Sequence, residues 1–327
     1  MDDYAQRLER TLEQPQARTG SLELPAWPRP RELGEQPEDI RLSSAQTLTL
    51  LDCGMTNRLA ERNSTLARVQ AASQRLRPEW AGIQELADCV QKVEESETDE
   101  VATLLQRKQA NWPRYVFQAS LGSEEMRDFL SLQQLRRSFP QAGRQALEQL
   151  SEMVQKSLEG QPPPARQLET VLHSLSESQA GGAILAQQAQ LGLGLQRSNQ
   201  ALRAFLEVQP LCIQGLQPKR AEVMQTIFRK FYLGQVQPLW SELSRTKAAM
   251  NTVFQSLFQA LEPVLAVTAM DYYRGYWQPG NDWDERLDDV AGEHVKLWQT
   301  ALRQCGMLPG QAQPAATAAR PNPPQTQ

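Results

Sequence analysis

The apolar residues between Ser43 and Glu94 recur at the spacing of an α-helix, and this pattern constrains the fold more than any other feature of the sequence. Ten of them stand three, four or seven positions apart: Leu48, Leu51, Met55, Leu59, Leu66, Val69, Leu76, Ile83, Leu86 and Val90. Residues at these intervals lie on one face of a helix, whereas a strand needs strict alternation. The segment is therefore predicted to form one helical hairpin or one long kinked helix.

Helical patterns also cover much of the remaining chain. Pro113 and Gly122 are expected to break a helix that begins near Val101, and Ser123 is expected to cap the next one. Further helices are predicted at residues 3–13, 140–159, 165–207, 218–261 with a kink at Pro238, and 284–304. Aromatic residues make up 6% of the chain, which favours helices over β-sandwiches. Without a sustained heptad run, the sequence predicts an all-α, irregular multi-helix bundle with long helical hairpins.

Prolines divide the chain into parts. Residues 14–40 carry prolines at 15, 25, 28, 30 and 37, which exclude a helix and favour an extended strap pinned to the core by Leu22, Leu24 and Trp27. The sequence QPPPAR after Gly160 is the clearest internal linker. We therefore expect an N-terminal helical subdomain with the strap (1–160), a C-terminal helical subdomain packed on it (161–307) and a disordered tail (308–327).

The charge pattern argues against nucleic acid as a partner. The chain has 34 basic and 38 acidic residues, a formal charge of −4, and no long run of lysine or arginine. Phosphate neutralisation needs clustered positive charge. The most apolar window, residues 253–270, contains a glutamate and Pro263, so it is predicted to be a buried helix and not a membrane span.

The sequence contains no recognisable catalytic or metal-binding pattern. His173 and His294 are the two histidines, and neither stands at a metal-ligand spacing. The acidic residues 281–289 lack the glycine and glutamate of a calcium loop, and they predict the start of a helix with Asn281 or Asp282 as its cap. We therefore assign no catalytic residue, no metal and no cofactor.

The densest aromatic group is the candidate binding surface of the chain. With neighbouring polar residues it comprises Tyr272, Tyr273, Arg274, Tyr276, Trp277, Trp283 and His294. Such a group suits stacking on a sugar or contact with a peptide, and the alternative is ordinary packing of a helix end, because aromatic rings dominate cores and interfaces alike. His294 lies among mixed charges on a predicted helix, which favours a hydrogen-bonding role over that of a base.

A polar tetrad, Glu61, Arg62, Asn63 and Ser64, interrupts the leucines of LAERNSTLARV. We interpret it as a structural joint. Arg62 is expected to hold a carboxylate from another helix, and Asn63 to bond the backbone at a helix break or where the strap crosses. Inward-facing polar groups need such partners, since leaving one unsatisfied costs about 1–3 kcal/mol.

Four cysteines are spaced too widely for a Cys-x-x-Cys motif: Cys53, Cys89, Cys212 and Cys305. An even number allows two disulfides in three connectivities, or four buried thiols in a cytosolic protein. A hairpin turn near Ala71 leaves Cys53 and Cys89 each 18 residues from the bend and therefore side by side. This favours 53–89 and 212–305 bridges, although Pro78 offers a rival bend.

Several stretches resemble the bacterial lipoproteins catalogued as domain of unknown function 3080. They are DDYAQRLERTLE, LPAWPRPREL, LLDCGMTNRLAERNSTLARVQAASQRL with Cys89, FRKFYLGQVQPLWSEL and HVKLWQTALRQCGMLPG. The Arg62-Asn63-Ser64 run and the Cys305-Gly306 ending are the most specific. Residues 130–205 contribute little to the resemblance, and Ala67 stands where a glycine is usual.

The resemblance implies a location and gives no reaction. The chain opens MDDYAQRLER, without the basic and apolar regions of a signal peptide. A member of this family is expected to have a leader and a lipid-modified cysteine upstream of Asp2, with Met1 in place of the leader. The protein would then be anchored to a membrane, facing the periplasm, with all four cysteines oxidised. A cytoplasmic location is the alternative if no leader precedes the chain.

Three functions are compatible with these features. The first is a non-enzymatic periplasmic lipoprotein that binds an envelope protein or glycan. The second is an envelope hydrolase or peptidoglycan-modifying enzyme that uses carboxylates and His294 in an unfamiliar arrangement. The third is a helical pore-forming toxin subunit, which the long helices and the apolar 253–270 window allow.

Overall fold

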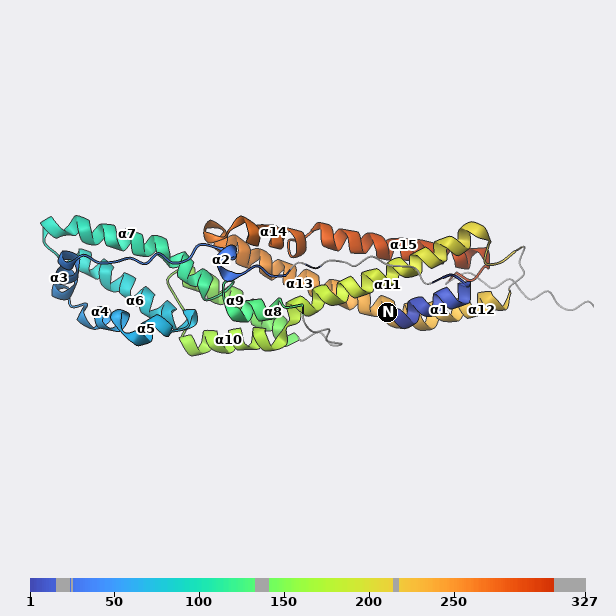
Figure 1. Cartoon of the computed structure of the whole chain (residues 1–327), viewed down its shortest axis with the longest axis horizontal. Helices are drawn as coiled ribbons and strands as arrows, with labels where there is room; N and C mark the ends of the chain where they lie inside the picture. The colour runs from blue at the N-terminus through green and yellow to red at the C-terminus, as the bar shows by residue number, and fades with distance from the viewer. Residues whose placement is uncertain (16–23, 25, 133–140, 214–217, 309–327) are drawn as a thin grey trace, which may run out of the picture. The chain divides into compact units, whose positions relative to one another are not determined.

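The computed structural model describes residues 1–15, 24, 26–132, 141–213 and 218–308, and these ranges are dominated by helices (Figure 1). Among them, Gly34 and Leu265 form an isolated antiparallel bridge, and no strand is found in these ranges. The predicted all-α fold class is therefore confirmed. The expected disordered tail falls almost wholly on residues 309–327, which lie outside the described residues, as does Leu22 of the strap.

The chain divides into two compact units, each assembled from segments distant in sequence. Unit 1 comprises Met1–Leu22, Gln188–Glu242 and Arg286–Gln327, and unit 2 comprises Glu23–Gln187 and Leu243–Glu285. The boundary expected near residue 160 falls inside unit 2. This is because the helices on either side of QPPP, α9 (Gln141–Leu158) and α10 (Ala165–Ser178), pack against each other.

Gly160, which follows α9, shows how tight this connection is. Its φ of 84° lies in the left-handed region that glycine adopts without strain. A Cβ atom at this position would lie 2.3 Å from the ring of Trp80. The proline-rich segment therefore serves as a close turn between packed helices and does not separate two domains.

The first helical arm of unit 2 is built from three short helices, α3 (Ser44–Asp52), α4 (Thr56–Asn63) and α5 (Thr65–Val69). Gly54, with φ 86°, ends the first of them, and Ser64 separates the other two. The chain then turns in extended conformation at Gln70 and Ala71, as the hairpin prediction placed it.

The returning arm of the hairpin is α6 (Ala72–Val90), which packs along α7 (Glu95–Gln118) (Figure 1). The rival bend at Pro78 is not used, because this proline lies within α6. Pro113 likewise lies within α7, so the predicted break there is wrong. A proline removes one donor to the carbonyl four residues earlier, and Gln109 lies on the exposed side of the helix, where water reaches that carbonyl.

The remaining parts of unit 2 secure the strap. Contrary to expectation it contains a short helix, α2 (Pro30–Leu33), which a proline at its first position permits. Beside it, the Glu35 N–H donates to the Val264 carbonyl at 2.8 Å, and the Ala266 N–H donates to the Leu33 carbonyl at 2.8 Å. Trp27 is buried against the rings of Phe258 and Tyr272, as its predicted anchoring role requires.

Two later helix starts are capped as the sequence indicates, at Ser123 and Asn281. The Ser123 hydroxyl accepts from the Met126 N–H at 3.1 Å and begins α8 (Glu124–Phe129). A 3-10 turn (Glu262–Val264) and α14 (Val267–Tyr276) follow later in the chain. The Asn281 side chain accepts from the Asp284 N–H at 3.0 Å at the start of α15 (Asp282–Gln304), as predicted.

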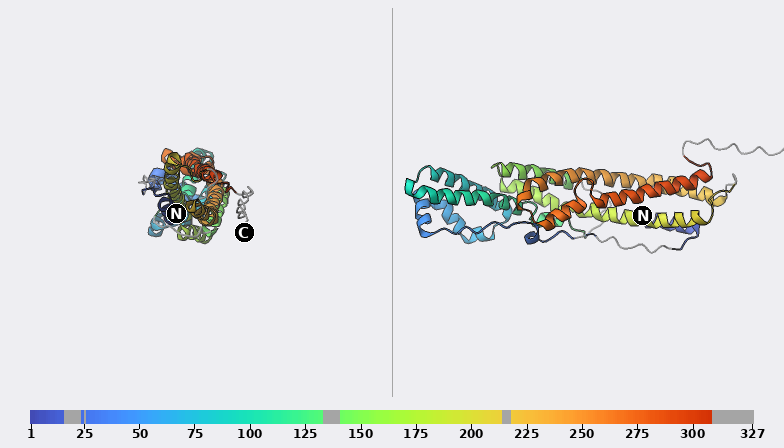
Figure 2. Two further views of the ribbon diagram at one scale, coloured as in Figure 1. Left: turned by 90° about the vertical axis from the view of Figure 1, so that its right-hand side faces the viewer. Right: turned by 90° about the horizontal axis from the view of Figure 1, so that it is seen from above.

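Unit 1 is assembled from helices near both ends of the chain. α1 (Asp2–Leu12) lies against α12 (Lys219–Ile227), as Figures 1 and 2 show. The unit also takes residues from α11 (Ala180–Val208), which is separated from α10 by Gln179 at φ 47°, so the predicted single helix 165–207 is two helices.

The irregularity expected at Pro238 takes the form of a π-helix. Residues Phe228–Val236 form this stretch, and α13 (Gln237–Leu261) follows directly. Pro238 cannot donate to the carbonyl of Gly234, so the α-helical ladder is interrupted at this point. A local shift to wider π-type pairing is one way in which helices absorb such a loss.

Disulfides join segments within each unit. Cys53 is bonded to Cys89 in unit 2 with a Cα–Cα distance of 5.5 Å, and Cys212 to Cys305 in unit 1 with a Cα–Cα distance of 5.2 Å. This is the pairing that the hairpin argument favoured, and all four cysteines are used.

The Cys53→Ala/Cys89→Ala variant should be less stable than the wild type by about 4 kcal/mol, because the bond closes a loop of 36 residues in the unfolded chain. Denaturant unfolding monitored by circular dichroism measures this difference. The Cys212→Ala/Cys305→Ala variant is the matched comparison in unit 1. An unchanged unfolding midpoint for the first variant would contradict the expectation.

Candidate functional site

The polar tetrad is a joint, with partners that differ from those expected. Ser64 caps α5 by accepting from the Ala67 N–H at 3.1 Å and donates to the Glu61 carbonyl at 2.7 Å. Arg62 donates to the Ile40 carbonyl of the strap at 3.0 Å, so it holds the backbone and not a carboxylate. Asn63 is exposed at the end of α4, and the strap contact expected of it is made by Arg62.

Most of the aromatic group around α14 is packed in the core, which agrees with the alternative of ordinary helix-end packing. Tyr272, Tyr273 and Trp283 are buried, and Trp277 is 0% exposed. The ring centroids of Trp277 and Phe254 lie 4.4 Å apart. Burial of these large rings stabilises the helix end, which leaves Arg274 as the exposed residue of the group and Tyr276 partly buried.

A buried lysine, which the sequence analysis missed, lies beneath this aromatic group. Lys247 of α13 is 1% exposed, and burial lowers its pKa to about 8 despite the opposing charge of Asp284. Its Nζ donates to the Tyr276 carbonyl at the end of α14, to Asn251 Oδ1 at 3.1 Å and to Asp284 Oδ2 at 3.2 Å. These bonds tie α13 to the end of α14 and the start of α15, which is a structural role.

His294 belongs to unit 1, whereas the aromatic residues that the sequence grouped with it belong to unit 2. The side chain is 0% exposed, and burial lowers its pKa to about 3. Its Nε2 is 2.7 Å from Tyr4 Oη, its Nδ1 is 2.6 Å from Asn199 Oδ1, and Trp298 Nε1 donates to Nε2 at 3.0 Å. Both ring nitrogens are therefore engaged by protein, and His294 is a core hydrogen-bonding residue.

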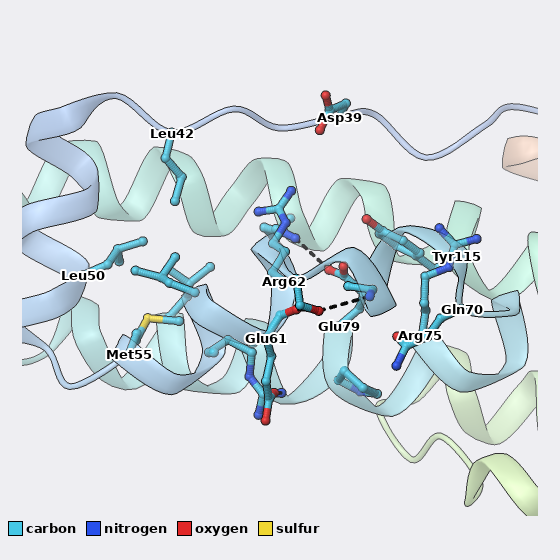
Figure 3. A pocket seen from close by; sticks show the side chains of 18 of the residues that line it. Asp39, Leu42, Leu50, Met55, Glu61, Arg62, Gln70, Arg75, Glu79 and Tyr115 are labelled. Atoms are coloured by element: carbon cyan, nitrogen blue, oxygen red, sulfur yellow. Dashed lines mark hydrogen bonds and ion pairs between the residues drawn. The ribbon is translucent and has the colours of Figure 1, made fainter.

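A cavity with both apolar and charged lining lies within unit 2, between the strap, the short helices α3–α5 and helices α6 and α7 (Figure 3). Its volume is about 550 Å³, within the range of roughly 300–1,000 Å³ typical of ligand sites. Figure 3 shows Leu42, Leu50 and Met55 at one end and Arg75 and Tyr115 toward the other. We call this cavity the unit 2 pocket.

The apolar end of the unit 2 pocket belongs to a continuous hydrophobic cluster. The buried members are Ile40, Leu50, Met55, Leu59, Leu86, Cys89, Val101 and Leu104. Cys53 and Leu42 pack against the same cluster, so the Cys53–Cys89 bond joins two of its members.

The polar end of the unit 2 pocket contains an ion pair held away from solvent. Lys108 Nζ lies 2.7 Å from Glu79 Oε2, and the two side chains are 9% and 17% exposed. Burial lowers the pKa of Lys108, and the positive charge of Arg62 acts in the same direction. Burial also raises the pKa of Tyr115 to about 12, with the charge of Glu79 adding to the effect. Both pKa values at this end are therefore set by burial together with the charges of Glu79 and Arg62.

Sequence reasoning found part of this pocket and missed the rest. The tetrad contributes Glu61, Arg62 and Ser64 to the lining. Arg75, Glu79, Lys108 and Tyr115 were not singled out. The signal that could have found them is their spacing. Arg75 and Glu79 stand four residues apart on α6, and Lys108 and Tyr115 stand seven apart on α7, so each pair projects from one face of its helix.

Metal-binding groups and membrane-spanning helices are both absent from the described residues. In the ranges that the structure describes, no three or more histidine, cysteine, aspartate or glutamate side chains are grouped to hold a metal ion. Among the described helices, none combines the length and apolar character needed to cross a membrane.

The fold and the site together define an all-α, disulfide-bonded protein of two units with an amphipathic pocket in one of them. The chain belongs to the family described as "Protein of unknown function (DUF3080)", whose model matches residues 1–309. The resemblance noted in the sequence is thereby confirmed. No curated protein and no solved structure matches the chain.

Replacing Arg62 with alanine should lower the free energy of unfolding by roughly 1–2 kcal/mol, because the strap loses a charged hydrogen-bond donor at Ile40. Thermal unfolding of Arg62→Ala measures the loss. Arg77→Ala is the matched control, since Arg77 is exposed on α6. Equal melting temperatures for the two variants would refute the joint.

The stability of unit 1 should fall in acid because of His294. Its pKa is about 3 in the folded protein and near 6.5 when unfolded, so the unfolded chain binds more protons between these values. The contribution of neutral His294 is complete above pH 6.5 and is lost as pH falls toward 3, by roughly 2 kcal/mol between pH 6.5 and 4.5.

Denaturant unfolding at a series of pH values measures this dependence. His294→Gln should show a shallower acid dependence than the wild type. His173→Gln should match the wild type, because His173 is exposed on α10. A slope in His294→Gln as steep as in His173→Gln would show that His294 does not carry the effect.

Proposed function

We propose that the protein is a periplasm-facing lipoprotein with a binding and not a catalytic role, held at the outer membrane by a lipid upstream of Asp2. Its partner is another component of the cell envelope, and the unit 2 pocket is where that component binds. The family resemblance supports the anchor, and the pocket supports the binding role.

The observation that carries the proposed compartment is the pairing of all four cysteines. Disulfides persist in oxidising compartments such as the bacterial periplasm and are rare where thiol reductants are maintained. Each bond also joins segments far apart in the chain, with sequence separations of 36 and 93, as expected of structural bonds.

The chemistry of the pocket favours binding over catalysis. Its described lining includes neither histidine nor cysteine. The Ser64 hydroxyl is occupied by the Ala67 N–H and the Glu61 carbonyl, and Glu79 is held by Lys108. A nucleophile needs an adjacent base that is free to take its proton. The arrangement is instead that of a ligand site, with an apolar surface and a few placed polar groups.

One experiment in living cells tests both parts of this proposal. The gene, with its natural upstream coding sequence, is expressed in its native host with a photo-crosslinking amino acid at Leu66, an exposed pocket-lining residue. The matched control carries it at Val208, which is exposed in unit 1. Irradiation should yield an envelope-derived adduct at Leu66 and little or none at Val208.

The same cells report the compartment. Protein denatured in an alkylating reagent should show no alkylated cysteine by intact mass, and four after reduction. Four alkylated cysteines without reduction would place the protein in a reducing compartment. Equal adduct yields at the two positions would remove the unit 2 pocket as the binding site.

A further inference from the structure

The unit 2 pocket differs in character from end to end. The residues at its apolar end are aliphatic or carry a thioether: Leu42, Leu50, Met55, Leu59, Leu86 and Leu104. These side chains offer no hydrogen bond, so sugar hydroxyl groups buried here would be left unsatisfied. An alkyl chain loses nothing by the same transfer and gains the hydrophobic contribution. This end therefore suits hydrocarbon and disfavours a glycan.

The carboxylates of the pocket are already neutralised. Glu79 pairs with Lys108 at 2.7 Å, Glu61 with Arg58 at 3.0 Å, and Asp39 with Arg41 at 3.3 Å. Arg58 also pairs with Glu85 at 2.8 Å. Each of these lining carboxylates already has a cationic partner, which disfavours a basic ligand.

Two lining cations remain without a carboxylate. Arg62 and Arg75 form no ion pair with any residue that the structure describes. One nitrogen of Arg62 bonds the Ile40 carbonyl, and its guanidinium has further donors. Arg75 Nε is buried and has no hydrogen-bond acceptor in the described protein. An unsatisfied buried donor is rare in folded proteins and calls for an explanation, of which an absent ligand is one.

Guanidinium groups bind carboxylates and phosphates through paired hydrogen bonds, which a carbonyl oxygen does not reproduce. A ligand that satisfies Arg75 and Arg62 is therefore an anion, and one that fills the remainder of the pocket has a hydrocarbon chain. Figure 3 shows Arg62 between the leucine end and Arg75, so one molecule passing along the pocket meets both environments.

We propose that the unit 2 pocket binds a single-chain anionic amphiphile, with its alkyl chain against Leu42, Leu50 and Met55 and its carboxylate or phosphate at Arg62 and Arg75. This inference rests on the proposed function for the location of the site and goes beyond it in naming the ligand class. A free fatty acid and a lysophospholipid are the two sources of this chemistry.

Calorimetric titration of the purified full chain tests the ligand class, with each amphiphile below its critical micelle concentration. Laurate carries the carboxylate, 12-carbon lysophosphatidylglycerol the phosphate, and monolaurin the same chain without charge. At least one of the anions should bind with one molecule per chain and about tenfold more tightly than monolaurin. The tighter anion identifies the source.

Chain length and charge are then separated. Octanoate should bind more weakly than laurate, and butyrate and inorganic phosphate should not bind measurably, because they leave the apolar end unfilled. Monolaurin binding as tightly as both anions would overturn the role of the arginines. Absence of binding by both anions would overturn the ligand class.

Arg75→Met provides the sharpest variant. It should weaken binding of the preferred anion about tenfold while leaving the melting temperature equal to or above that of the wild type, because no protein partner of Arg75 Nε is lost. Arg77→Met, an identical change at an exposed position on the same helix, should alter neither quantity. Unchanged affinity in Arg75→Met would refute the assignment of the headgroup.

The two proposals fail in different ways. A crosslinked adduct at Leu66 in cells, combined with no amphiphile binding in the titration, would keep the site and reject the ligand class. Selective binding of an anion in the titration, combined with four free thiols in cells, would keep the ligand class and reject the periplasmic location.

Discussion

The bond between Cys53 and Cys89 is the constraint on which the unit 2 pocket depends. One wall of this pocket consists of α3, α4 and α5, helices of nine, eight and five residues. Isolated helices of this length are not stable in water. The disulfide fixes the first of them to the end of α6, and Arg62 fixes the second to the strap. These short helices therefore depend on links to other segments, and their own hydrogen bonds are not enough to keep them folded.

Buried polar groups give each unit a second kind of connection. In unit 1, His294 joins residues from α1, α11 and α15 through Tyr4, Asn199 and Trp298. In unit 2, Lys247 joins α13 to the end of α14 and the start of α15. Such networks are costly when one member is missing, since the rest are left buried without partners. They therefore favour one arrangement of helices over others with equal apolar burial.

Local signals in the sequence were sufficient for much of the fold. Apolar spacing indicated the helices, Ser123 and Asn281 marked two helix starts, and the equal distances of Cys53 and Cys89 from Ala71 indicated their pairing. Pro113 misled because a helix tolerates proline where the freed carbonyl reaches water.

Properties that depend on distant segments were beyond a local reading. The division into units follows contacts across more than 200 residues, so the prolines after Gly160 were a poor guide. Aromatic residues of α14 looked like a surface because composition does not reveal which side a helix buries. In the pocket, Arg62 could be identified from the sequence as a joint residue. Arg75 is of interest because its buried Nε has no acceptor, and a missing acceptor cannot be seen in a sequence.

The assembly of unit 1 from both ends of the chain sets the order in which the protein can be completed. Tyr4 and His294 are 290 residues apart, so the contacts of α1 are complete only when α15 has been synthesised. Most of unit 2 is one continuous run, Glu23–Gln187, and is available much earlier. Unit 2 can therefore begin to fold before unit 1 is complete, because unit 1 needs segments from both ends of the chain.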